Sequence, residues 1–378
     1  MDRCTIDSGR DIGAIMRKEI EIAGRKIGAG HPALLIAEMS ANHNMDYGRA
    51  VEIIHRAKEA GADAVKIQTY TADTITIDSD KPWFQITQGT LWDGTTLHKL
   101  YEKAYTPWEW QPKLKEEAKK AGLLFFSAPF DHSAVDFLEE MDVPCYKIAS
   151  FELNDIPMLR KIAKLGKPIL MATGVSYEKD IRLAVETCRE EGNDQIILLK
   201  CTSAYPAPFD AVNLRMIPAM ARTYDCLTGL SDHTMGHQAA LGAAALGACV
   251  IEKHLTLRRA DGGADAAFSM EPEEFREMCE GIRIVEQALG AETYELSEKQ
   301  RREREHSRSL FVTEDIRAGE YFTPENMRSI RPAFGLHTKY FEEILGKRAV
   351  RDLEKGTPMR FAYVEGMEER EDELGLDG

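Results

Sequence analysis

Eight short apolar runs, each followed by an amphipathic helical pattern, restrict the fold of this 378-residue chain more than any other feature. The runs lie at residues 34–39, 64–69, 123–128, 145–149, 168–173, 195–201, 226–230 and 248–254. Nearly continuous apolar character over so few residues is typical of parallel strands that are buried on both faces. Eight such strands alternating with eight helices predict an α/β fold, a (β/α)8 TIM barrel. An open doubly wound sheet also alternates, but the count of eight and the absence of a GxGxxG turn after the first run favour the barrel.

The connection between the second and third runs is long for a barrel loop. Residues 71–105 carry Trp83 and Trp92, and Trp108 follows shortly after. A long aromatic insertion after a barrel strand lies on the active face. It either shapes the substrate pocket or forms a small packing subdomain, and the sequence leaves both interpretations open.

The alternating pattern stops after residue 289. We predict a barrel domain over residues 1–290 and a charged linker over 291–308, where SEKQRREREHSR is the main segment. A small β-rich domain follows over residues 309–366, which is too short for a large core of its own. Residues 367–378 are strongly acidic and are expected to form a disordered tail.

Composition excludes several classes of function. The chain has 63 acidic and 48 basic residues, a formal net charge of −15, which is a poor basis for general nucleic-acid binding. Seven cysteines are scattered with no CxxC pair, which fits reduced thiols better than a disulfide framework. No stretch approaches the roughly 20 apolar residues of a membrane span. We therefore expect a cytoplasmic protein that contacts neither nucleic acid nor membrane.

Polar residues stand at the carboxyl ends of the predicted strands, where barrel enzymes carry their catalytic groups. They include Glu38, Lys66, Gln68, Ser127, Lys147, Ser150, Lys200, Asp232, His233, Glu252, Lys253 and His254. Lys66 and Lys147 fall inside apolar runs, and a buried lysine is costly unless an anion or a carboxylate meets it. They indicate a phosphate or carboxylate clamp, a buried Lys–Glu pair, or a Schiff-base lysine.

Two histidines end adjacent predicted strands. His233 and His254 are therefore expected to converge, and two imidazoles with nearby oxygen ligands suit a divalent metal. Glu38 supplies a carboxylate on the neighbouring strand, as a general base or as a further ligand.

Seven motifs follow one another along the chain: AEMSANHN, VKIQTYTADT, YKIAS, KCTSAYP, GLSDHTMG, IEKHLTL and GGADAAFS. In this order, over roughly residues 20–365, the chain resembles the sialic acid synthase family, whose members join phosphoenolpyruvate to a sugar aldehyde. Residues 309–366 resemble the SAF (antifreeze-like) domain of that family. The segments AEMSANHN and LRRADGGADAAFS are most similar to the branch that makes pseudaminic acid from 2,4-diacetamido-2,4,6-trideoxy-L-altrose. Branches that make N-acetylneuraminate or legionaminic acid use the same chemistry on another acetamido sugar.

The resemblance implies roles for the matching residues. The carboxylate and phosphate of phosphoenolpyruvate would be held by Lys66, Lys147, Ser150 and Ser231. Residues facing the sugar would be Gln68, Glu152, Tyr205 and Asp265. The catalytic set would be Glu38, His233 and His254, with the two histidines holding a divalent metal, either Mn2+ or Mg2+ with Co2+ as a third candidate. Arg331 of the SAF domain would reach into the barrel of a partner subunit, which implies a domain-swapped homodimer.

Four positions depart from the pattern that is common in the family. Ala128 stands where threonine is frequent and Ala172 where serine is frequent, so we expect a phosphate site with two hydroxyls fewer. Ser40 and Met45 replace glycines of the first motif as sialic acid synthases more often have it.

Two unrelated functions compete with this interpretation. A metal-dependent isomerase or hydrolase would use the histidines and Glu38 but would leave Lys66 and Lys147 without an anion. A carbohydrate- or ice-binding protein on a degenerate barrel is disfavoured by the intact polar strand ends. Phosphate release in the presence of both substrates separates the synthase from these alternatives.

Overall fold

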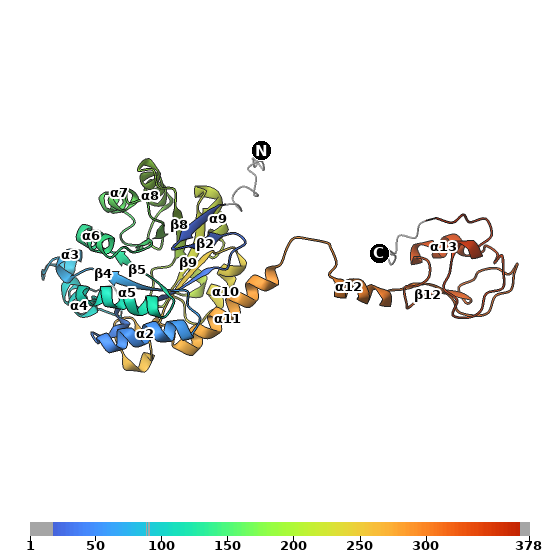
Figure 1. The fold of residues 1–378 in the computed structure, drawn as a ribbon, viewed down its shortest axis with the longest axis horizontal. Coiled ribbons are helices and arrows are strands. Elements are labelled where there is room, and N and C mark those ends of the chain that lie inside the picture. Colours follow the sequence, from blue (N-terminus) through green and yellow to red (C-terminus); the bar gives the residue numbers. More distant parts are fainter. Residues whose placement is uncertain (1–17, 88, 90, 371–378) are drawn as a thin grey trace. The chain divides into compact units, whose positions relative to one another are not determined.

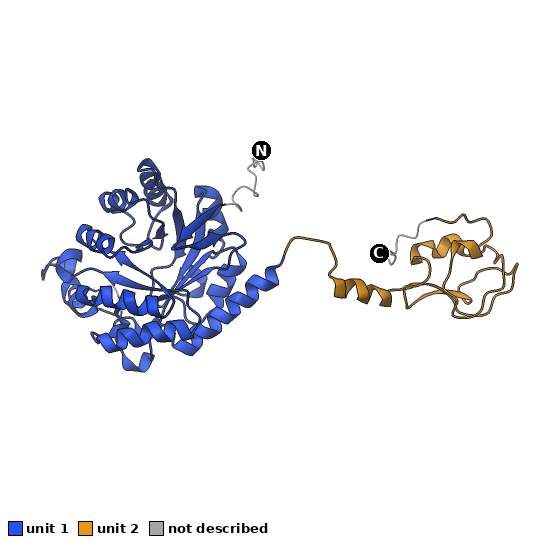
Figure 2. Ribbon diagram, viewed as in Figure 1, with its two compact units in different colours: residues 1–290 blue, residues 291–378 orange. Residues whose placement is uncertain are grey.

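The computed structural model describes residues 18–87, 89 and 91–370. The chain divides into two compact units, Met1–Gly290 and Ala291–Gly378 (Figure 2). Residues 371–378, which make up most of the predicted acidic tail, lie outside the described residues.

Unit 1 is built around a closed parallel barrel with the strand order β10-β3-β4-β5-β6-β7-β8-β9 (Figure 1). The barrel strands are β3 (Leu34–Glu38), β4 (Ala64–Thr69), β5 (Leu124–Pro129), β6 (Tyr146–Ile148), β7 (Ile169–Ala172), β8 (Ile196–Cys201), β9 (Leu227–Asp232) and β10 (Val250–His254). The predicted (β/α)8 barrel is confirmed, with strand ends that differ by one or two residues from most of the apolar runs.

Eight helices surround the barrel in the predicted alternation. They are α2 (Tyr47–Glu59), α5 (Gln111–Lys120), α6 (His132–Glu140), α7 (Ile156–Ala163), α8 (Glu178–Glu190), α9 (Met216–Tyr224), α10 (Gln238–Ala245) and α11 (Pro272–Leu289). Helix α2 illustrates why they form: Asp46 caps its start by accepting from the Arg49 amide, and its buried positions recur at helical spacing. Gly61, with a φ of +91°, provides the left-handed turn into β4.

A hairpin that the sequence analysis did not predict precedes the barrel. Strands β1 (Glu19–Ile22) and β2 (Arg25–Gly28) pair antiparallel, and their isoleucines are buried in the barrel core. Arg25 contacts Asp63 at 2.6 Å and Lys18 contacts Asp194 at 2.8 Å. Both aspartates stand just before barrel strands, so the hairpin covers the amino-terminal end of the barrel and leaves the carboxyl end as its mouth.

The insertion after β4 contains two short helices, α3 (Ala72–Ile75) and α4 (Leu97–Ala104). Its tryptophans have different environments. Trp92 contacts Tyr205 at a ring-centroid distance of 5.7 Å, whereas Trp83 is 80% exposed. Trp108, just beyond the insertion, stacks on Phe137 of α6 at 4.7 Å. Part of this region therefore faces the residues of the mouth and part of it packs on the helical layer.

Unit 2 has a separate small core. Its elements are α12 (Glu298–Glu303), β11 (Ser309–Val312), β12 (Met327–Ile330) and α13 (Phe341–Ile344). Strands β11 and β12 pair antiparallel, and residues from the whole of the predicted small domain form one apolar cluster. The exposed helix α12 lies within the segment predicted to be a charged linker.

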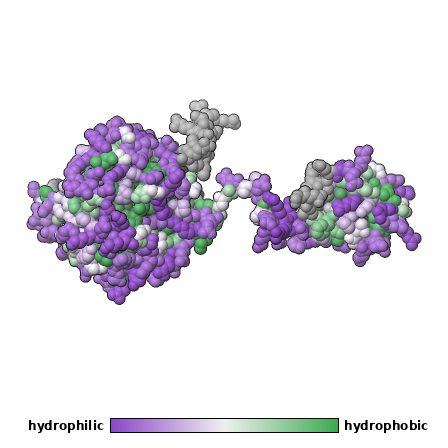
Figure 3. Space-filling model, in the orientation of Figure 1, coloured by the Kyte–Doolittle hydropathy of each residue, from purple (hydrophilic) through white to green (hydrophobic). Residues whose placement is uncertain are grey.

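The visible faces of both units are mostly hydrophilic (Figure 3). Of the helices within the described residues, none combines the length and the apolarity needed to cross a bilayer. The six cysteines in the described part of the chain are buried free thiols.

Candidate active site

Strand register brings the polar side chains together inside the barrel. Register partners on neighbouring parallel strands point to the same side of the sheet. Glu38 of β3 is the partner of Lys66 of β4 and of His254 of β10. Glu252 of β10 is the partner of Ser231 of β9. All five side chains are buried and lie near the carboxyl end of the barrel interior.

A network of buried charges is centred on Glu252. Lys66 Nζ donates to Glu252 Oε1 at 2.9 Å and lies 3.1 Å from Glu38 Oε2. Lys147 Nζ lies 3.5 Å from the same oxygen of Glu252, and Ser231 Oγ donates to it at 3.1 Å. The second oxygen of Glu252 is buried without a hydrogen-bond partner. The network therefore gathers two ammonium groups around one carboxylate oxygen.

The pKa values of the two carboxyls move in opposite directions. Burial raises the pKa of Glu38 to about 7, although Lys66 lowers it. Burial also acts to raise the pKa of Glu252, but Lys147 and Lys66 outweigh it and hold that pKa well below its usual value. Glu252 is thus a permanent counter-charge, whereas Glu38 can exchange a proton near neutral pH.

The lysines are paired with carboxylates, which was one of the three interpretations of the sequence. Burial alone would lower the pKa of Lys66, but Glu252 and Glu38 raise it above its usual value. Lys66 is therefore an ammonium group and a poor Schiff-base nucleophile. Burial lowers the pKa of Lys147.

His233 and His254 form the second part of the site. Their ring centroids lie 5.2 Å apart. His233 Nδ1 lies 3.1 Å from the carbonyl oxygen of Thr202, to which it donates. Burial acts to lower the pKa of His233, but Cys201 and this carbonyl outweigh it and raise that pKa above its usual value. His254 Nδ1 is buried without a hydrogen-bond partner. Burial and the nearby His233 lower the pKa of His254 well below its usual value, so its ring is neutral.

This pair of imidazoles fits a divalent metal once His233 has given up its second proton, because neutral imidazole nitrogens are the usual donors to such ions. Within the described residues, no group of three or more His, Cys, Asp and Glu side chains is arranged to hold a metal ion. Two histidines would therefore be the protein ligands, and water or substrate oxygens would fill the remaining positions.

Aromatic rings cover the histidines on one side. Tyr205, which follows β8, lies 4.5 Å from His233 and 5.1 Å from Phe268 between ring centroids. Phe268 also lies 5.0 Å from His254, and Trp92 lies 5.7 Å from Tyr205. The mouth therefore has an apolar wall next to the imidazole pair.

Ser150 and Glu152 follow β6 on another side of the mouth. The Gly174 amide donates to Ser150 Oγ at 3.0 Å, and a Cβ at Gly174 would come within 2.8 Å of the same oxygen. Glu152 Oε2 is buried without a hydrogen-bond partner. Burial raises the pKa of Glu152 to about 7, although Lys147 lowers it. A buried, unpaired acceptor of this kind is suited to a polar ligand.

Of the remaining predicted site residues, one contacts the network around Glu252, one lies in the loop after β10 and one belongs to unit 2. Gln68 Nε2 donates to Glu38 Oε1 at 3.2 Å. Asp265 is buried in the loop after β10, where it accepts a hydrogen bond from Ser40. Arg331 belongs to unit 2 and is exposed there.

Several polar strand-end residues point away from the barrel interior, because side chains alternate along a strand. Lys253 Nζ pairs with Asp232 Oδ2 at 2.6 Å, one position away from the inward residues of each strand. Ser127 Oγ donates to the Ile67 carbonyl at 3.0 Å. Ala128, the register partner of Gln68, faces inward instead.

Glu252 is one of the polar strand-end residues predicted to lie at the mouth, but the sequence assigns it no role. Its position two residues before His254 on one strand is the signal that places both on the same face. Its contacts with both lysines make it central to the site.

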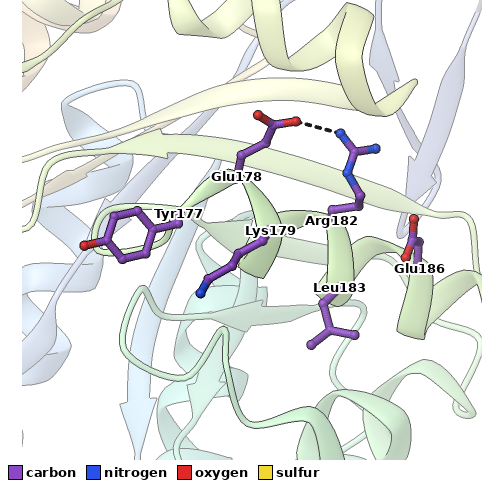
Figure 4. A pocket seen from close by; sticks show the side chains of 6 residues that line it. All are labelled: Tyr177, Glu178, Lys179, Arg182, Leu183 and Glu186. Atoms are coloured by element: carbon purple, nitrogen blue, oxygen red, sulfur yellow. Dashed lines mark hydrogen bonds and ion pairs between the residues drawn. The ribbon is translucent and has the colours of Figure 1, made fainter.

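A surface hollow elsewhere in unit 1 lacks these features. It runs along α8 and is lined by Tyr177, Glu178, Lys179, Arg182, Leu183 and Glu186 (Figure 4). Glu178 and Arg182 form an exposed ion pair at 2.7 Å, one helical turn apart. The buried charges and histidines of the mouth are thus the better candidate for chemistry.

Comparison with known proteins identifies relatives over most of the chain. The model of the NeuB family matches residues 53–294, and that of the SAF domain matches residues 307–365. A pseudaminic acid synthase of Campylobacter jejuni is 45% identical over 326 residues, which are 86% of this chain and 95% of the relative. An N,N'-diacetyllegionaminic acid synthase of Campylobacter jejuni is 37% identical over 331 residues, 86% of this chain and 98% of the relative.

A solved structure supports the same relationship. The crystal structure of N-acetylneuraminic acid synthetase from Leptospira borgpetersenii, in complex with citrate, matches with a TM-score of 0.67 and 30% sequence identity. The match covers 76% of this chain and 95% of that one.

Proposed function

Since the chain belongs to the NeuB family and ends in a SAF domain, we propose that it condenses phosphoenolpyruvate with 2,4-diacetamido-2,4,6-trideoxy-L-altrose. The products are pseudaminic acid and inorganic phosphate. The observation that carries the acceptor is the 45% identity to a pseudaminic acid synthase, against 37% to a legionaminic acid synthase at similar coverage. The second candidate is the same condensation on the legionaminic acid precursor or on N-acetylmannosamine.

Phosphoenolpyruvate binds at the buried lysines. Lys66 and Lys147 already converge on a single carboxylate oxygen, 2.9 and 3.5 Å away, which supports a site for the anionic groups of this substrate. Ser231 and Ser150 donate from β9 and from the loop after β6. In a site this well buried, the fixed ammonium groups stabilise the phosphate charge more than water would.

The reaction forms one carbon–carbon bond and one carbon–oxygen bond, the latter from water, and breaks the carbon–oxygen bond to phosphate. C3 of phosphoenolpyruvate attacks the sugar aldehyde carbon, the aldehyde oxygen takes up a proton from solvent, and C2 becomes an oxocarbenium ion. Water adds to C2 and loses a proton to Glu38, whose raised pKa suits a general base near neutral pH. The new C2 hydroxyl then loses its proton as the bond between C2 and the phosphate oxygen breaks, which leaves a 2-keto acid and phosphate.

His233 and His254 would hold a divalent metal, with Mn2+, Mg2+ and Co2+ as candidates. When bound, such an ion polarises the aldehyde carbonyl as a Lewis acid. The neutral ring of His254 and the carbonyl-bound Nδ1 of His233 support this role.

The acceptor sugar lies above this centre, against Gln68, Glu152, Tyr205 and Asp265. The rings of Tyr205, Phe268 and Trp92 supply an apolar surface that suits the 6-methyl group of a trideoxy sugar. The buried acceptors of Glu152 and Asp265 suit the hydroxyl and amide donors of the same sugar.

The first test is phosphate release from phosphoenolpyruvate with Mn2+ and each of three sugars. We expect release with the trideoxy-altrose sugar and at least tenfold lower kcat/KM with N-acetylmannosamine and the legionaminic acid precursor, because a misplaced hydroxyl or amide leaves buried groups unpaired. Faster release with either of the other sugars would keep the reaction and change the acceptor. Release with none of them, from folded and metal-loaded protein, would overturn the proposed function.

We further propose a domain-swapped homodimer in which Arg331 completes the site of the partner subunit. In support, Arg331 is exposed and makes no hydrogen bond or ion pair within the described part of unit 2. Glu38→Gln and Arg331→Ala homodimers should each be inactive, whereas a swapped mixed dimer contains one site that carries neither change. Random exchange of subunits should then restore about a quarter of wild-type activity. An arrangement in which each subunit supplies its own Arg331 predicts no recovery.

A further inference from the structure

The first motif of the chain makes a set of contacts that the proposed chemistry does not use. Ser40, Asn42 and Asn44 lie in or next to the 3-10 turn Ser40–His43, which follows β3. Their side chains all donate to one segment, the loop over residues 255–271 between β10 and α11. We call this segment the β10–α11 loop, and it carries Asp265.

Ser40 and Asn42 hold Asp265 from two directions. Ser40 Oγ donates to Asp265 Oδ2 and thereby fixes the carboxylate. Asn42 Nδ2 donates to Leu255 O and to Ser269 Oγ, both at 2.9 Å, and Ser269 Oγ donates to Asp265 O at 2.6 Å. The side chain and the main chain of Asp265 are therefore both tied to the turn after β3.

The outer part of the loop is tied to the same turn. Asn44 Nδ2 donates to Gly262 O at 3.1 Å. Arg49 donates to Asn42 O at 2.7 Å and to Asp261 Oδ2 at 2.6 Å. The loop thus has fixed contacts near Leu255, near residues 261–262 and at Asp265 itself.

Ser40 is held in a backbone conformation that is unfavourable for serine. Its φ is +45°, in the left-handed region, and its side chain is buried. Met45 has a similar φ of +57°, but it is 41% exposed. Glycine would relieve the backbone at both positions, yet only at position 40 would it also remove a hydrogen bond to Asp265.

We propose that Ser40 and Asn42 are positioning residues that orient Asp265 toward the acceptor sugar. The inference rests on the proposed function, because it takes Asp265 as a residue that faces the sugar. Neither side chain touches the network around Glu252, so phosphoenolpyruvate binding does not depend on them. A purely structural role predicts instead that stability and both substrates are affected together.

The test compares Ser40→Gly, Ser40→Ala and Met45→Gly in the full-length protein. Loss of one hydrogen bond to a carboxylate should raise the KM for the acceptor sugar about tenfold in both Ser40 variants. The KM for phosphoenolpyruvate should stay within twofold of wild type. Met45→Gly is the matched control, since it relieves the same backbone strain and should leave both KM values unchanged.

Melting temperatures distinguish an effect of Ser40 on the position of Asp265 from an effect on the stability of the fold. Ser40→Ala keeps the unfavourable φ, so it should melt about 2 °C below Ser40→Gly. Both variants should nevertheless show the same acceptor KM. An acceptor KM that follows the melting temperature across the three variants would overturn the proposal.

A double-mutant cycle links the effect to Asp265. If Ser40 acts only through this carboxylate, Asp265→Asn and the double variant Ser40→Gly/Asp265→Asn should have the same acceptor KM. Additive increases would overturn the proposal. If wild type releases phosphate with none of the sugars, the proposed function fails, and the same cycle measured in melting temperatures still decides whether the two residues are coupled.

Discussion

Replacing Glu252 with glutamine should lower the free energy of unfolding by about 3–5 kcal/mol, because it leaves Lys66 and Lys147 buried without their shared counter-charge. Glutamine preserves the shape of the side chain, so the decrease in the free energy of unfolding measures the effect of the missing charge and not that of a cavity. Urea denaturation at pH 7 measures it. Glu178→Gln breaks the exposed pair with Arg182 on α8 and serves as the control, with no measurable loss expected.

Phosphoenolpyruvate should partly rescue the Glu252→Gln protein. The ligand brings a carboxylate and a phosphate to the lysines, so its stabilising effect should be larger in the variant than in wild type. Melting curves with and without the ligand measure this difference. Equal shifts in the two proteins would mean that the ligand binds away from these lysines, and a variant as stable as wild type would mean that Glu252 is not their essential partner.

Replacing Glu38 with glutamine should lower kcat by about 10³-fold, within the range for loss of a general base. The KM for phosphoenolpyruvate should change little, since both lysines remain paired with Glu252. Steady-state phosphate release with both substrates measures the two constants. Glu59→Gln, an exposed carboxyl at the end of α2, is the control and should behave as wild type.

The Glu38→Gln variant should also differ from wild type in the pH dependence of kcat/KM. The pKa of Glu38 is raised to about 7 by burial, and the proton-accepting form is the carboxylate. In wild type, kcat/KM should therefore rise with pH through about 7, and this limb should be absent from Glu38→Gln. Because the folded pKa lies above the unfolded one, the stability that Glu38 contributes is present at low pH and is lost as pH rises through about 7. A limb that persists in the variant would assign the titration to another group, and Glu152 would be the next candidate.

The sequence predicts the barrel well because each strand and each helix is recognisable from its own residues. An apolar run such as 34–39, followed by a helix that begins after Asp46 and ends before Gly61, is recognisable without any distant contact. The hairpin β1–β2 was not predicted because each of its short strands has only two buried positions, and these stand among charged residues in EIEIAGRKIG. Its stability comes from tertiary contacts with residues such as Asp63 and Asp194, far along the chain.

The sequence predicts which kinds of residue form the site, but it does not predict which of their side chains contact one another. Lys66 and Lys147 stood out as charges in apolar runs, and the structure joins them through Glu252. Which polar strand-end residues face inward depends on register between strands, which no single strand reveals. Lys253 therefore looked equivalent to its neighbours, although it pairs with Asp232 on the outer side of the sheet.

The hairpin β1–β2 covers the amino-terminal end of the barrel, so substrates would reach the buried side chains from the carboxyl end. Glu252, which pairs with both lysines, precedes His254 by two residues on β10 and therefore lies deeper in the barrel. With phosphoenolpyruvate at the lysines, as proposed, a sugar bound beside His254 would lie between it and the mouth, so we expect phosphoenolpyruvate to bind before the sugar.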